Sequence, residues 1–234
     1  METIVEIKKS RVIGLLRRLA RPLLVRYYSK QFNNIVLEDI MGKHFIVLPK
    51  VFHPGLFFTS KFFVSCFNKE TVKETDYVLD MGTGSGIEAI FAADYCKRVI
   101  ATDINPYAVR CAKINVMLNN LEDKIDVRQG DLFEPVKDEK IDLILYSPPY
   151  YSGKPSGWFE HAIKAGDNYE VIFRFISEAG KHLNPGGRIL VILSTDTALN
   201  AILNEFKNNG YNINLIASKR NIGEVMYVYE MKLI

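Results

Sequence analysis

The chain has 234 residues, of which 48% are hydrophobic, and this size suits one globular core with a small extension. Its glycine and proline contents are ordinary, which argues against a disordered chain. No apolar run reaches the ~18 residues of a membrane span, so we expect a soluble protein without a membrane partner. The three cysteines are far apart and form no C-x-x-C pair. This spacing argues against a disulfide framework or metal site and favours the reducing cytoplasm.

The net charge of +3 is unevenly distributed along the chain. Residues 1–30 contain eight lysines and arginines against two glutamates, a net charge of +6 that leaves −3 for the rest. Such a basic arm suggests a polyanionic partner such as nucleic acid. A solvated basic helix face explains the same charges equally well, and a transit peptide is a lesser alternative.

The first 50 residues are expected to form a small extension of a basic helix and a β-hairpin. Leucines at helical spacing predict a helix over about residues 10–28. Two β-rich runs, 35–37 and 45–48, flank a glycine turn at 41–43 and predict the hairpin. Prolines then interrupt the chain, and the apolar stretch 56–67 is compatible with a helix.

From residue 76 onward, short apolar strands alternate with helical patterns. Strands are expected at 77–79, 98–102, 125–128, 141–146 and 189–193, with helices at 87–97, 106–119, 169–182 and 197–208. A turn is expected at 184–187, and the segments 211–217 and 224–231 are expected to close the sheet as an antiparallel pair. This order predicts a doubly wound α/β domain over residues 51–234, built on a mainly parallel sheet.

A glycine-rich turn runs from Asp80 to Gly86, directly after the first strand of this domain and before a helix. Glycines there permit a tight turn and close approach of a ligand to the backbone, and the next strand ends in Asp103, about 20 residues further on. A carboxylate so placed can accept hydrogen bonds from ribose hydroxyls. The pattern fits a dinucleotide or S-adenosylmethionine, but Asp80 would repel a pyrophosphate and suits an ammonium group.

Three segments resemble successive motifs of class I S-adenosylmethionine-dependent methyltransferases: Val78–Gly86, Ala101–Asp103 and Gly130–Phe133. The resemblance covers roughly residues 50–232 and implies a Rossmann-like fold with a seven-stranded sheet. It also implies a cofactor site for S-adenosylmethionine. The residues so assigned are Gly82, Thr83, Gly84 and Gly86 for the methionine part, Asp80 for the turn or the amino group, Asp103 and Ile104 for the ribose, Asp131 and Leu132 for adenine, and Thr59 for the carboxylate.

The fourth strand ends in a Pro-Pro motif, Ser147-Pro148-Pro149-Tyr150. It resembles the (Asn/Asp/Ser)-Pro-Pro-(Tyr/Phe) motif of methyltransferases that act on nitrogen conjugated to a π system. Such nitrogens are poor nucleophiles, and rigidly presented carbonyls can orient them. The resemblance makes these four residues catalytic. Ser147 is expected to touch the cofactor as well, and the Tyr150 ring to stack on the acceptor.

The segment Val51–Gly55 and the end Ser218–Glu224 resemble the entry segment and closing hairpin of the HemK-like, small-domain methyltransferases. HemK-like enzymes carry asparagine where this chain has Ser147, so the resemblance does not fix glutamine as the substrate. Ser-Pro-Pro-Tyr is also similar to cytosine amino methyltransferases.

A long loop after the Pro-Pro motif gathers aromatic and basic residues and is expected to be a substrate lid. Trp158 in this loop either stacks on a base or closes the edge of the core, and His161 is expected to be a surface or capping residue.

The function predicted first is N-methylation of a macromolecule, either an RNA or DNA base or a glutamine in a translation factor. The alternatives are a small-molecule methyltransferase and a non-catalytic binding module.

Overall fold

A computed structural model describes residues 32–55, 58–221 and 224–234 of the chain. The helix predicted over residues 10–28, and the whole basic arm 1–30, lie outside this part. The predicted hairpin is confirmed: β1 (Val36–Ile40) pairs antiparallel with β2 (Lys43–Val47). Met41 and Gly42 form its turn with positive φ angles of 51° and 82°, the combination that a two-residue hairpin turn requires.

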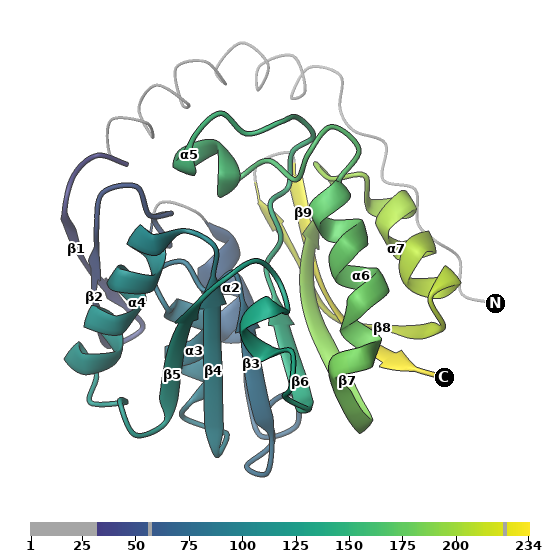
Figure 1. Cartoon of the computed structure of the whole chain (residues 1–234), viewed down its shortest axis with the longest axis horizontal. Coiled ribbons are helices and arrows are strands. Elements are labelled where there is room, and N and C mark those ends of the chain that lie inside the picture. The colour runs from purple at the N-terminus through teal and green to yellow at the C-terminus, as the bar shows by residue number, and fades with distance from the viewer. Residues whose placement is uncertain (1–31, 56–57, 222–223) are drawn as a thin grey trace.

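The main sheet has seven strands in the order β5-β4-β3-β6-β7-β9-β8 (Figure 1). The parallel strands are β3 (Tyr77–Met81), β4 (Arg98–Asp103), β5 (Ile125–Gln129), β6 (Ile141–Tyr146) and β7 (Leu183–Ser194). Antiparallel to its neighbours on both sides, β9 (Glu224–Leu233) lies between β7 and β8 (Tyr211–Asn221). The predicted mainly parallel sheet with an antiparallel C-terminal pair is therefore confirmed.

Helices cover both faces of this sheet, because successive residues of its buried strands point to opposite sides. Val78 belongs to the hydrophobic core on one face and Leu79 to the core on the other. The first face carries α2 (Phe58–Ser65), α3 (Ile87–Ala92), α4 (Pro106–Leu118) and the hairpin. The second carries the short helix η1 (Glu134–Val136), α6 (Glu170–His182) and α7 (Leu199–Asn208).

The strand order reverses at β3, which has β4 on one side and β6 on the other. The chain runs from β3 through β4 to β5 in one direction and then crosses back to β6. In open α/β sheets such a reversal leaves a crevice at the carboxyl ends of the strands. In Figure 1 the small helix α5 (Trp158–His161) lies across this end of the molecule, apart from the helices that cover the faces.

A buried side chain of α4, Asn115, makes several of the hydrogen bonds that dock the hairpin on the α/β domain. Its Oδ1 accepts from the amide of Ile46 at 2.7 Å, and its Nδ2 donates to the Ile46 carbonyl at 2.9 Å. Nδ2 also donates to the carbonyl of Ser85 at 2.8 Å. The same side chain thus ties the hairpin to the glycine-rich turn.

Two predicted boundaries were wrong. The helix predicted over 87–97 ends at Ala92, because the chain turns there to reach β4 at Arg98. The turn predicted at 184–187 lies within β7, where Leu183 already pairs with Ile141 and the register shifts before Leu143. The residues at 184–187, which commonly end helices, therefore form the irregular first part of β7.

Within the described ranges, none of the helices is long and apolar enough to cross a membrane.

Candidate active site

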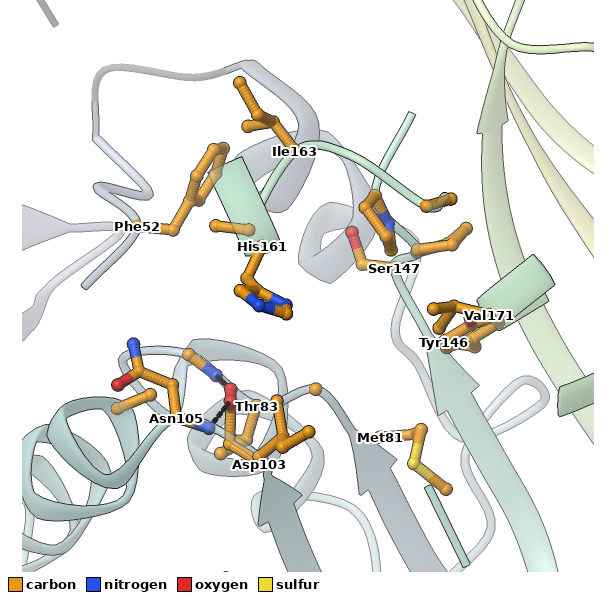
Figure 2. A pocket seen from close by; sticks show the side chains of 18 of the residues that line it. Phe52, Met81, Thr83, Asp103, Asn105, Tyr146, Ser147, His161, Ile163 and Val171 are labelled. Carbon is orange, nitrogen blue, oxygen red and sulfur yellow. Dashed lines mark hydrogen bonds between the residues drawn. The ribbon is translucent and has the colours of Figure 1, made fainter. Parts of the chain in front are cut away.

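A cavity of about 430 Å³ lies at the carboxyl ends of β3, β4 and β6, at the reversal point of the sheet. Its size is that of a pocket for a nucleoside-sized ligand. The cavity brings together the glycine-rich turn, the ends of β4 and β5, and the Pro-Pro motif, which lie far apart in sequence. Figure 2 shows Thr83 and Asp103 on one side of it, and Ser147 and Tyr146 on another.

The glycine-rich turn is held in shape by Asp80. Its Oδ2 accepts from the Thr83 hydroxyl at 2.5 Å and from the Ala89 amide, in the first turn of α3, at 3.1 Å. Gly86 has a φ of 88°, and a Cβ there would lie 3.3 Å from the backbone of Ala112 in α4. The turn is therefore shaped by a buried carboxyl and by close packing of α4.

At the tip of β4, Asp103 closes the next part of the cavity. Its Oδ2 accepts from the Gly84 amide at 2.9 Å, and its Oδ1 accepts from the Asn105 amide at 2.8 Å (Figure 2). Ile104 follows, 44% exposed and lining the cavity. Asp103 thus links the glycine-rich turn to the start of α4.

The residues expected at the adenine end also line the cavity, but Asp131 already has a protein partner. Its Oδ2 accepts from Nη2 of Arg174, on α6, at 2.8 Å. Leu132 is buried and adopts a left-handed φ of 46°. Nearby, the ring of Tyr146 stacks on Phe175 with 3.8 Å between centroids. The assignment of Asp131 to adenine stays a prediction.

The charges of the cavity suit a cationic ligand. Burial raises the pKa of Asp80 to about 7 and that of Glu88, which is 5% exposed, to about 8. A bound ammonium group would favour the ionised form of Asp80. In addition, the buried Ser85 hydroxyl has no hydrogen-bond partner within the described part of the chain, although Ser85 lines the cavity. Asp80 and Ser85 fit S-adenosylmethionine.

The Pro-Pro motif follows β6, and all four of its residues, Ser147, Pro148, Pro149 and Tyr150, line the cavity. The Tyr150 hydroxyl interacts with the side chains of Ser147 and Thr59 and donates to the Ile192 carbonyl at 3.4 Å. Thr59 therefore lies beside the Pro-Pro motif and also lines the cavity. Burial raises the pKa of Tyr150, so its hydroxyl stays protonated.

Sequence reasoning missed three acidic residues of the cavity, Glu88 on α3, Glu170 at the start of α6 and Glu224 at the start of β9. The Glu88 carboxyl interacts with the Ser60 side chain, and Ser194 donates a short hydrogen bond to Glu224. A signal for Glu88 was present, because α3 reads Ile-Glu-Ala-Ile-Phe-Ala and is otherwise apolar. No comparable signal marks Glu224, whose place depends on how β9 inserts into the sheet.

The loop after the Pro-Pro motif folds over the cavity. Two bridges hold it together, between Tyr151 and Lys164 and between Gly153 and Gly166. Trp158 lines the cavity and contacts Tyr107 edge-on, with 6.4 Å between ring centroids. His161 is exposed, as expected of a surface residue, and its ring also faces the cavity near Thr83 and Asp103 (Figure 2).

Comparison with known proteins agrees with this geometry. The family described as "Methyltransferase small domain" matches residues 43–217. The chain belongs to this family. Its match begins inside β2, so the predicted division into 1–50 and 51–234 stays a prediction.

A putative protein N5-glutamine methyltransferase of Methanocaldococcus jannaschii is 36% identical over 156 residues, which are 64% of this chain and 77% of that protein. A release factor glutamine methyltransferase of Clostridium acetobutylicum is 33% identical over 57% of this chain and 52% of that protein, so the match spans only about half the relative's length. The solved ribosomal protein L11 methylase of Lactobacillus delbrueckii has a TM-score of 0.59 at 25% identity, over 78% of this chain and 82% of that chain. The fold is therefore the Rossmann-like methyltransferase fold.

As a member of this family, the chain is a methyltransferase that uses S-adenosylmethionine. No group of three or more potential metal ligands occurs among residues 32–55, 58–221 and 224–234.

Proposed function

We propose that this protein transfers a methyl group from S-adenosylmethionine to the side-chain amide nitrogen of a glutamine in a protein. The observation that carries the proposal is the meeting of the glycine-rich turn and the Pro-Pro motif in one cavity. The first motif suits the cofactor and the second a conjugated nitrogen. In a cavity that contains both motifs, the methyl donor and the methyl acceptor would bind side by side.

In this proposal the cofactor occupies the part of the cavity between the glycine-rich turn and β5. Gly82, Thr83 and Gly84 contact the methionine part, for which Asp80 supplies negative charge and Thr59 a hydroxyl. Gly86 packs against Ala112 of α4 and shapes the turn. Asp103 and Ile104 contact the ribose, and Asp131 and Leu132 contact the adenine. All of these residues except Asp80 and Gly86 line the cavity, and Asp80 acts through the turn that it holds.

The Pro-Pro motif holds the acceptor. When bound, S-adenosylmethionine supplies a methyl group that is activated by the positive sulfur. The lone pair of an amide nitrogen is delocalised into the carbonyl, so the protein must orient the group and stabilise positive charge on nitrogen. The Pro148 and Ser147 carbonyls are suited to accept the N–H groups, since the two prolines fix the backbone. Transfer would form the nitrogen–carbon bond as the carbon–sulfur bond breaks, and the proton lost by the nitrogen would pass to water.

The choice of glutamine rests on the relatives. The Methanocaldococcus jannaschii and Clostridium acetobutylicum proteins are both described as glutamine methyltransferases. A substrate in the translation machinery would place the protein in the cytoplasm. The net charge of +6 in residues 1–30 favours a second candidate, a base amine of an RNA.

The proposal is tested by following a tritiated methyl group from S-adenosylmethionine into an extract separated into protein, RNA and small molecules. We expect label in protein, and after acid hydrolysis of the labelled protein we expect it as methylamine. Pro148→Ala should lower the incorporation about 100-fold, because a displaced acceptor loses effective concentration. Label in RNA would favour the second candidate, and label only in small molecules would contradict both.

A further inference from the structure

Glu88 is the only charged residue of α3, a helix whose six residues are all buried. Burying a carboxyl group costs free energy unless a partner compensates for it. Asp80, the neighbouring buried acid, is explained by the two hydrogen bonds with which it holds the glycine-rich turn. Glu88 makes no such bond to the turn. Its side chain interacts with Ser60 of α2 and lines the cavity.

Glu88 lies at the Pro-Pro end of the cavity. Its partner Ser60 is next to Thr59, whose side chain interacts with the Tyr150 hydroxyl. Glu224 interacts with Ser194 of β7, two positions from Ile192, whose carbonyl accepts from the same hydroxyl. The two acids come from different elements, α3 and β9, and each is held by a hydroxyl, Ser60 for Glu88 and Ser194 for Glu224. Two positioned carboxyl groups therefore stand beside the motif proposed to hold the acceptor.

The Pro-Pro motif does not by itself supply every hydrogen-bonding group that an acceptor amide requires. HemK-like enzymes have asparagine at its first position, with an amide that can both donate and accept. Here Ser147 is shorter, and its side chain already interacts with Tyr150. A primary amide presents a carbonyl oxygen and two N–H groups, so it requires a donor and acceptors at fixed positions.

We propose that Glu88 and Glu224 bind the methyl-acceptor amide, with the Glu88 carboxylic acid donating to its carbonyl oxygen and the Glu224 carboxylate accepting from its N–H group. This inference rests on the proposed function, whose acceptor site it completes. Glu88 and Glu224 together favour methyl-accepting groups in which one carbon carries both an N–H group and an atom that accepts a hydrogen bond. It disfavours simple amines and hydroxyl compounds, which lack the carbonyl oxygen.

The protonation state required of Glu88 agrees with its surroundings. Burial, reinforced by the neighbouring Asp80, raises the pKa of Glu88 to about 8, so at pH 7 its carboxyl carries a proton and can donate it. The titratable groups around it include Asp80 of β3, Tyr150 after β6 and Glu224 of β9. Each of these is acidic, so none of them supplies a positive charge that would ionise Glu88.

The test compares Glu88→Gln and Glu88→Ala in the full chain, with Glu122→Ala, an exposed glutamate outside the cavity, as the control. Tritiated-methyl transfer into the labelled fraction of the extract is measured at saturating S-adenosylmethionine, and cofactor affinity is measured by calorimetry. Glu88→Ala should lower transfer about 30-fold, a loss in the range of one hydrogen bond. The Kd of this variant for S-adenosylmethionine should stay within about 3-fold of the wild-type value, since Glu88 binds the methyl acceptor and not the cofactor.

Glutamine can still donate an N–H group, so Glu88→Gln should retain about a third of the wild-type transfer. It should also lose the decline in activity above pH 8 that ionisation of Glu88 causes in the wild type. Wild-type transfer by Glu88→Ala would overturn the inference. A cofactor Kd weakened as much as the transfer rate would overturn it too, by assigning Glu88 to the cofactor.

The two proposals can fail separately. Label in RNA instead of protein contradicts the choice of glutamine. A base amine beside a ring nitrogen also pairs a donor with an acceptor, so the same variants then decide the role of Glu88 on RNA.

Discussion

Among single residues, Asp80 and Glu88 are two buried acids whose pKa is raised strongly by burial. Their pKa values of about 7 and about 8 in the folded chain compare with ordinary values near 4 in an unfolded one. The folded state therefore binds more protons than the unfolded state between about pH 4 and pH 8. The stability that this contributes is fully present below about pH 4 and is lost as the pH rises through 8.

Glu88→Gln removes the titration of Glu88. In the absence of cofactor we expect the variant to be more stable than the wild type at pH 8.5, by at least about 1 kcal/mol, since one pKa unit corresponds to about 1.4 kcal/mol. The difference should shrink toward pH 5. Urea denaturation at pH 5.5, 7 and 8.5 measures it, with Glu122→Gln as the exposed control. A difference independent of pH would show that Glu88 is ionised in the folded protein.

At the scale of elements, Arg188 joins β7 to the segment that precedes β3. Its guanidinium donates to both oxygens of Asp76, at 2.7 and 3.2 Å, and to the Thr71 carbonyl at 2.8 Å. Both side chains are almost fully buried, at 3% and 4% exposure. Arg188→Ala leaves the Asp76 charge buried without this partner, so we expect a loss of about 3 to 5 kcal/mol of unfolding free energy.

Arg128 offers a matched comparison for this prediction. It also contacts two carboxylates, of Asp126 and Glu139, but its side chain is 27% exposed. Arg128→Ala should cost less than about 1 kcal/mol, because exposed ion pairs are screened by water. Denaturant titration of both variants checks the contrast, and equal losses would mean that burial does not decide the strength of these pairs.

On the scale of the whole molecule, cofactor binding should stabilise the fold, because the site is assembled from the ends of several strands. S-adenosylmethionine at one hundred times its Kd contributes about 2.7 kcal/mol to the folded state. For a chain of this size the expected rise in Tm is roughly 5 to 10 °C. Thermal denaturation with and without cofactor measures it. The same cofactor concentration should leave the Tm of Asp103→Ala almost unchanged, and an undiminished rise in that variant would contradict its place in the site.

Sequence alone determined the class of fold, the cofactor motifs and the Pro-Pro motif. These follow from local rules: alternation of apolar residues marks strands, and positive φ angles and tight turns require glycine. Asp103 could be placed at a strand end before any coordinates, since parallel strands present their carboxyl ends at one edge.

Only the tertiary structure decided which side chains share the cavity with these motifs. Glu88 and Glu224 are 136 positions apart in the chain, and their meeting depends on how β9 inserts between β7 and β8. That the exposed His161 also lines the cavity follows from the position of its loop, which no local pattern indicates. Contacts of this kind depend on packing between distant elements, for which the local pattern of residues holds no signal.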